Sequence, residues 1–231
     1  MRSGISYHVD ATNGSSRRLS VKIEIDGPFN ENILELRFPR WVPGSYFIRE
    51  PIQHMSDLSA ACDGKEVEIK RVNVDGARIT GVSDASKVVV TYRLLAAEMT
   101  CRANHLDKTH VHIMPPYTWM MPTRGIDKER LNQRHKVTLA TPEGWNTATQ
   151  LSGEEGEWYA EGRDEFLDAI MESNANPIIS FDVMGTTQYL KLWDSGGLPI
   201  PKKGLDRFIE AMKLVIEEHF ALFGIPEWKD Y

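Results

Sequence analysis

The sequence predicts a mainly β fold, a β-sandwich, followed by a C-terminal α/β extension that contains one long helix. Several short runs alternate apolar with polar residues, and turn-forming Gly, Pro and Asp residues separate these runs. The alternation stops at a Gly- and Pro-rich break at residues 195–201. Beyond the break, apolar residues recur at offsets of three and four, which is the spacing of an amphipathic helix.

The strands are predicted from this alternation. Residues 19–25 carry Leu, Val or Ile at every second position, which is typical of a strand with one buried face. Residues 34–38 repeat the pattern after an Asp-Gly-Pro turn. Residues 87–95 are β-branched and nearly continuous, and they form the strongest candidate. Further strands are expected at residues 67–74, 111–114, 136–139 and 178–183.

The long helix is expected from Leu205 to Phe223, and Gly224 is well placed to end it. A shorter helical turn is expected at residues 163–171. The apolar face of the long helix needs a partner. That partner is either the sandwich or a domain that continues beyond residue 231.

Composition limits the class of protein. Hydrophobic residues make up 41% and charged residues 26%, as in ordinary globular proteins. The net charge of −6, without a basic run, argues against nucleic acid or a membrane surface as a partner. No run of eighteen apolar residues predicts a membrane span, and the N-terminus lacks the apolar core of a signal peptide. We therefore expect a cytoplasmic protein in which Cys62 and Cys101 are free thiols, with a single disulfide as the alternative.

The segment at residues 38–50 is too specific to be a generic strand and turn. Its central Pro-Gly pair predicts a turn, and Trp41 and Tyr46 are large amphipathic side chains that we expect to be buried. Arg49 would clamp the turn by pairing with a carboxylate. The alternative is that this loop faces a catalytic cleft.

A second candidate region holds three of the seven histidines. Because side chains alternate along a strand, His110 and His112 would point to the same face. With Asp107 or His105 as a third ligand, they could bind zinc or another borderline metal. The alternative is that they make hydrogen bonds at a strand edge.

The segment at residues 114–122 combines Pro and Met around two aromatic residues. It is either an exposed apolar loop that covers a neighbouring domain or a connection packed on its own sandwich. No nucleophile elbow and no phosphate-binding loop occur in the sequence.

One motif in the segment at residues 38–50 is Trp41-x-Pro43-Gly44-Ser45-Tyr46-x-x-Arg49. With the stretches at residues 90–93, 106–110, 141–145, 166–169 and 181–185, it forms a series of motifs in a fixed order. In these motifs the sequence resembles the N-terminal domain of the glycyl aminopeptidase family, whose members are zinc metallopeptidases that usually carry a PDZ domain.

The resemblance implies a β-sandwich domain at residues 1–175, similar to the N-terminal domain of the aminopeptidase N class. It implies that residues 176–231 are the opening strands and first helix of a thermolysin-like catalytic domain, truncated here. The implied partners are the downstream catalytic and PDZ domains and a peptide substrate. By the same analogy, Asp107, His110, Tyr46 and Arg49 would line the substrate cleft.

The chain departs from the family at the metal site. The family's zinc is bound by a His-Glu-x-x-His helix, and none of the seven histidines here is followed by Glu. We therefore expect no catalytic residue and no cofactor in this chain, zinc being held elsewhere in the full-length family enzyme. The chain would be a truncated piece or a decayed paralogue, inactive alone.

The predicted function is the N-terminal portion of a zinc metallo-aminopeptidase that releases N-terminal Gly or other small residues. This portion would shape the cleft and support the catalytic domain. One alternative is a stand-alone β-sandwich module that binds a protein or peptide. The other is a small metal-binding β protein that uses the cluster from His105 to His112.

Overall fold

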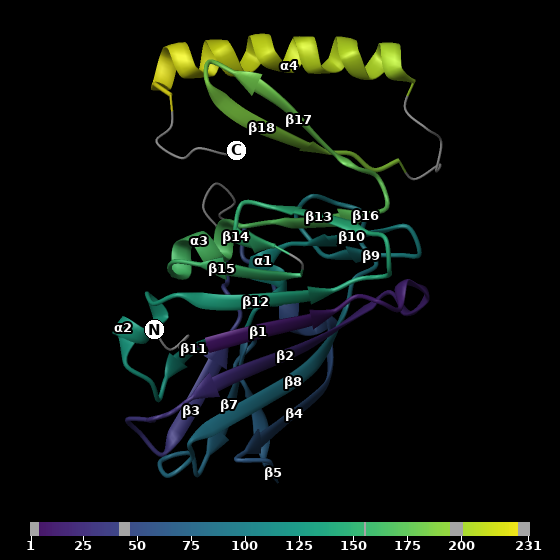
Figure 1. Cartoon of the computed structure of the whole chain (residues 1–231). Coiled ribbons are helices and arrows are strands. Elements are labelled where there is room, and N and C mark those ends of the chain that lie inside the picture. The colour runs from purple at the N-terminus through teal and green to yellow at the C-terminus, as the bar shows by residue number, and fades with distance from the viewer. Residues whose placement is uncertain (1–4, 42–46, 155, 195–200, 226–231) are drawn as a thin grey trace.

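The computed structural model describes residues 5–41, 47–154, 156–194 and 201–225. Tyr46, one of the predicted cleft residues, lies outside these ranges. The described chain is mainly β, with one long helix near its C-terminal end, as the sequence predicts (Figure 1).

An eight-stranded sheet forms the first layer of the sandwich. Its order is β14-β15-β12-β1-β2-β8-β4-β5, and β1 pairs in parallel with β12, whereas the other neighbours are antiparallel. The strands are β1 (Ile5–Asp10), β2 (Arg18–Asp26), β4 (Met55–Cys62), β5 (Lys65–Val67), β8 (Lys87–Leu95), β12 (His135–Ala140), β14 (Ser152–Glu154) and β15 (Glu157–Ala160).

Two four-stranded sheets pack against the first. One has the order β11-β3-β7-β6 and the other β13-β16-β10-β9. Their strands are β3 (Ile33–Arg37), β6 (Ile69–Val72), β7 (Gly76–Thr80), β9 (His105–Leu106), β10 (His110–Ile113), β11 (Met121–Arg124), β13 (Asn146–Thr149) and β16 (Met171–Asn174). Short helical turns connect them: η1 (Gly14–Ser16), η2 (Pro51–His54), α1 (Pro115–Thr118), α2 (Lys128–Leu131) and α3 (Arg163–Asp168).

A single buried cluster joins the three sheets. Tyr7 of β1 packs on Trp119 and Phe166, with ring centroids 5.4 and 4.4 Å away. Phe38, which follows β3, meets Tyr92 of β8 edge to face at 5.9 Å. Large apolar side chains from all three sheets thereby leave water, which is the main favourable term in folding.

One expectation about local structure needs correction, and one pair of alternatives is decided. Residues 67–74 are not one strand, because the chain leaves the first sheet after β5 and enters the second with β6, then turns at Asn73 with a φ of 57°. Of the two alternatives for residues 114–122, the exposed loop is excluded, since Trp119 and Met120 are 1% and 0% exposed. The chain packs this segment on its own sandwich, where it fills the core.

The C-terminal part forms a separate unit. Strands β17 (Ile178–Val183) and β18 (Thr186–Lys191) pair only with each other among the described strands, and α4 (Lys202–Phe223) contacts β17 (Figure 1). The helix ends as predicted, at Gly224 with a φ of 85°, where the N–H donates to the Phe220 carbonyl oxygen at 2.9 Å. None of the described helices is long and apolar enough to cross a membrane.

Candidate functional site

The predicted histidine cluster is assembled by the pairing of three strands. Strand β10 lies between β9 and β16, and its register sets His112 opposite both His105 and Glu172. His110 is opposite Asn174, one step along the same face as His112. The sheet therefore brings histidines of β9 and β10 against a carboxylate that lies about sixty positions away in the sequence.

Glu172 is the centre of this cluster. Its Oε2 lies 2.6 Å from Nε2 of His110, and its Oε1 accepts a hydrogen bond from Nδ1 of His112. Burial alone would raise the pKa of Glu172, but the hydrogen bonds from the two imidazoles outweigh burial and lower the pKa to about 2. The carboxylate is therefore ionised at neutral pH, and both imidazoles direct an N–H toward it.

Asp107 holds the turn between β9 and β10. Its Oδ1 accepts from the backbone N–H of Thr109 at 2.7 Å and of His110 at 2.9 Å, and Oδ2 lies 3.3 Å from Nε2 of His105. Burial acts to raise the pKa of Asp107, and the hydrogen bonds from Thr109 and His105 more than reverse it, so the pKa is lowered. Asp107 thus positions His105 and His110.

The end of the C-terminal hairpin closes the cluster. The indole of Trp193 stacks on His110 with centroids 4.3 Å apart, and its Nε1 donates to Oγ1 of Thr109 at 3.1 Å. Lys191 donates to the carbonyl oxygen of Asn174 at 3.2 Å, and burial lowers its pKa. A pocket of about 340 Å³ lies between the sandwich and this segment.

The arrangement is suited to bind a hydrogen-bond donor group of a ligand. Glu172 retains 32% of its side-chain exposure, so an ionised carboxylate reaches a pocket with an indole wall. It can accept hydrogen bonds from an amine or another cationic group. Nδ1 of His105, Nδ1 of His110 and Nε2 of His112 have no partner in the described chain, yet these atoms are shielded from solvent.

No three His, Cys, Asp or Glu side chains in the described ranges are placed to hold a metal ion together. Within the cluster, His110 and His112 each direct one nitrogen to Glu172. Because those nitrogens are already engaged, the geometry is that of a hydrogen-bonded carboxylate.

The described residues of the segment at 38–50, which are 38–41 and 47–50, do not line this pocket. The backbone N–H of Arg49 donates to the Arg40 carbonyl oxygen at 3.0 Å, and its Cζ lies 5.6 Å from the ring centroid of Phe47. No ion pair of Arg49 is found among the described residues, so its pairing with a carboxylate stays a prediction. Trp41 is 51% exposed, so the expectation that it is buried is wrong.

Sequence reasoning missed Glu172, Lys191 and Trp193. Glu172 sits on a four-residue strand, too short for a clear alternation. Lys191 ends β18 and Trp193 follows it. No local signal links either residue to the histidines, because their contact depends on how the hairpin folds back on β10.

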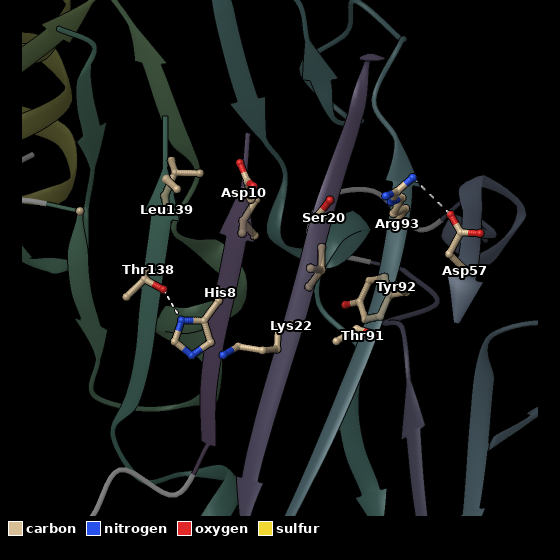
Figure 2. A pocket seen from close by; sticks show the side chains of 14 residues that line it. His8, Asp10, Ser20, Lys22, Asp57, Thr91, Tyr92, Arg93, Thr138 and Leu139 are labelled. Atoms are coloured by element: carbon tan, nitrogen blue, oxygen red, sulfur yellow. Dashed lines mark hydrogen bonds and ion pairs between the residues drawn. The ribbon is translucent and has the colours of Figure 1, made fainter. Parts of the chain in front are cut away.

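A broader hollow, of about 880 Å³, lies on the open face of the eight-stranded sheet. Figure 2 shows its polar side chains, in which His8 bonds Thr138 and Arg93 pairs with Asp57 at 3.7 Å. Lys22 pairs with a glutamate on its own strand. Because these groups already satisfy one another on an open surface, we place the candidate site in the smaller pocket beside Glu172.

The fold and the pocket define a β-sandwich domain with a pocket that residues at the end of a hairpin, Lys191 and Trp193, help to line. A family model described as the Peptidase M61 N-terminal domain matches residues 6–172. The chain belongs to this family. A search of the curated proteins finds no significant match.

Solved structures share the fold over nearly the whole chain. An aminopeptidase N family protein from Idiomarina loihiensis superposes with a TM-score of 0.82 at 20% identity, covering 98% of this chain and 38% of that one. An M1 zinc metallopeptidase from Deinococcus radiodurans gives 0.50 at 9% identity, covering 98% and 54%. Leukotriene A4 hydrolase from Saccharomyces cerevisiae gives 0.51 at 11% identity, covering 98% and 36%. The chain therefore spans about a third to a half of these proteins.

Proposed function

We propose that this chain is the N-terminal portion of a zinc metallo-aminopeptidase that releases N-terminal Gly or other small residues. In this proposal residues 1–175 are the sandwich domain, and residues 176–231 open a catalytic domain. Membership in the M61 N-terminal family and the fold shared with metallopeptidases support it. The chain would act in the cytoplasm, where Cys62 and Cys101 stay free thiols.

The observation that carries the proposal is the uncovered face of α4. The helix has 22 residues, and none is buried against the described chain. Phe208, Leu214 and Leu222 are 49%, 65% and 75% exposed. A helix of this kind gains most of its stability from packing, and a two-stranded sheet is too small to cover it. Further polypeptide on this face, a catalytic domain with a PDZ domain beyond it, would supply the missing contacts.

The chain's own role is to shape the substrate cleft. The pocket beside Glu172 lies where the sandwich meets the hairpin, and its walls include His110 and Trp193. Asp107 and Glu172 hold the imidazoles in place, so His110 would form a rigid part of the cleft wall. Arg49 and Tyr46, the second of which lies outside the described residues, stay in the proposal as cleft residues. Zinc would be held by residues outside this chain, since the motif that binds it is absent here.

The proposal is tested with two polypeptides from the same gene. One ends at residue 231 and the other extends through the next domain, and both are assayed with glycine p-nitroanilide after loading with zinc. We expect hydrolysis by the longer polypeptide only, abolished by EDTA. Chelator-sensitive turnover by the 231-residue chain would contradict the supporting role. A zinc-loaded longer polypeptide that releases no amino-terminal residue would contradict the aminopeptidase assignment.

The cleft role has its own test in the longer polypeptide. His110→Ala should raise KM for glycine p-nitroanilide by about tenfold or more, because a wall of the pocket is removed. His8→Ala is the matched control, since His8 lies on the open face of the eight-stranded sheet. Equal KM values for the two variants would exclude His110 from the cleft.

A further inference from the structure

A second pocket, of about 530 Å³, lies on another part of the sandwich. It is lined by the end of β3, the edge strand β11, α2 and the start of α3. Phe38 and Met121 in its lining are 2% and 4% exposed, and Leu131 is half-buried. The pocket therefore has an apolar floor.

The charges around this floor are strongly unbalanced. Its lining contains four cationic side chains, Arg37, Arg40, Lys128 and Arg163, and a single acidic one, Asp75. The whole chain carries a formal net charge of −6. A positive pocket on an acidic chain concentrates anions locally.

The negative charge of Asp75 does not cancel the positive charge that the pocket presents to a ligand. Its side chain is 5% exposed, and its oxygens are taken by Nη1 of Arg37 at 3.0 Å and by Nε of Arg40 at 2.6 Å. The bond through Nε leaves both Nη groups of Arg40 without a partner in the described chain, and that side chain is 51% exposed. Asp75 thus fixes the guanidinium of Arg40 with its outer donors available.

Lys128 and Arg163 provide the other available cations. Both are exposed, and neither forms a hydrogen bond or an ion pair with any residue that the structure describes. A lone surface lysine is normally only solvated. Here two cationic side chains without a partner among the described residues, Lys128 and Arg163, line the same pocket as the oriented guanidinium of Arg40, above an apolar floor.

We propose that this pocket binds an acidic peptide segment from another protein molecule. Its carboxylates would pair with Arg40, Lys128 and Arg163, and a neighbouring apolar side chain would cover the floor. Strand β11 is the edge of its sheet, so an extended peptide can lie along it. The aromatic ring in the lining, Phe38, is buried and offers no platform for a nucleic acid base. This inference does not rest on the proposed function.

The experiment measures binding of a fluorescein-labelled peptide, acetylated and amidated at its ends, with the sequence Glu-Leu-Asp-Phe-Glu. Fluorescence anisotropy is recorded with the 231-residue chain at low and at 0.5 M salt. The double variant K128E/R163E should bind at least tenfold more weakly, because two attractive charges become repulsive. The double variant K65E/K70E changes the net charge equally on β5 and β6, strands that do not line the pocket, and its affinity should stay within about twofold of the parent.

The proposal would be overturned if the parent chain did not bind the peptide at 1 mM protein. It would also be overturned if a peptide with Gln and Asn in place of the acidic residues bound equally well, or if the two double variants lost the same amount of binding affinity. Competition by inorganic phosphate at the same concentration as the peptide would mean a small-anion site and would also overturn it. Thermal melts of both variants confirm that a loss of binding is not a loss of folding.

Discussion

Replacing Glu172 by glutamine tests the centre of the candidate site. The change keeps the size of the side chain and removes the charge that His110 and His112 face. The folded-state pKa of about 2 lies below the reference value of 4.5. A carboxyl group with a depressed pKa stabilises the folded state fully above its unfolded pKa, and this stabilisation is lost as the pH falls from about 4.5 toward 2.

The magnitude follows from this shift. A difference of that size corresponds to about 3 kcal/mol of folding free energy at pH 7. The side chain is 32% exposed, so solvent screening reduces the expected value. We expect about 2 kcal/mol at pH 7 and about 1 kcal/mol or less at pH 3.

The assay is urea unfolding followed by tryptophan fluorescence at pH 7, 5 and 3. Glu172→Gln should be less stable than the parent at pH 7, and the difference should fall by half or more at pH 3. Glu68→Gln is the control, because that side chain is 70% exposed and pairs only with Lys70 among described residues. Equal stability of Glu172→Gln and the parent at pH 7, or a difference that does not change with pH, would refute the reasoning.

Two further substitutions test the frame that holds the site. Gly14→Ala would set a Cβ 2.0 Å from the carbonyl oxygen of Asp107, so the turn beside the histidines must move, at a cost of about 2 kcal/mol or more. Gly162→Ala meets its nearest atom at 3.7 Å and should change stability by about 0.5 kcal/mol or less; equal melting temperatures would contradict the steric argument. Tyr92→Phe removes two buried hydrogen bonds, one donated to the carbonyl oxygen of Thr118 at 2.6 Å and one accepted from the N–H of Met120 at 3.2 Å, and should cost about 1–3 kcal/mol in urea unfolding. A variant as stable as the parent would show that these bonds add nothing.

The sequence predicts those helices and strands in which one face is apolar and the apolar residues recur at the regular spacing of the element. In β2 the side chains of Leu19, Val21 and Ile23 are buried, and those between them are exposed or half-buried, so alternation alone reveals the strand. In α4 the spacing of apolar residues and Gly224 predict both the helix and its end. These signals are local, so they need no knowledge of the partner strands.

Strand β4 shows why other elements escaped prediction. Asp57 has a φ of 54°, and the pairing with β8 shifts between Ser56 and Ser59. This bulge breaks the period of two, so the apolar residues no longer fall on alternate positions. The segment is a strand because it pairs with β5 on one side and on the other with β8, where Ser59 and Thr91 face each other across 32 positions of sequence.

Local sequence pattern predicts one part of the candidate site, and long-range strand pairing supplies the other part. The shared face of His110 and His112 follows from the alternation of a strand, whereas Glu172 reaches them through a long-range pairing of β10 with β16. Trp41 was expected to be buried because it is large and amphipathic. It is 51% exposed, since burial depends on which parts of the chain lie against a residue and not on the residue type alone.

The position of the pocket links the two parts of the chain. His110 belongs to the sandwich and Trp193 follows the hairpin, yet their rings stack at 4.3 Å and form one wall. Lys191 and Asn174 make a second contact across the same junction. The pocket therefore exists only while the hairpin lies against the sandwich as it does here. A ligand that touches both His110 and Trp193 would favour this orientation of the hairpin, because it would contact both parts of the chain.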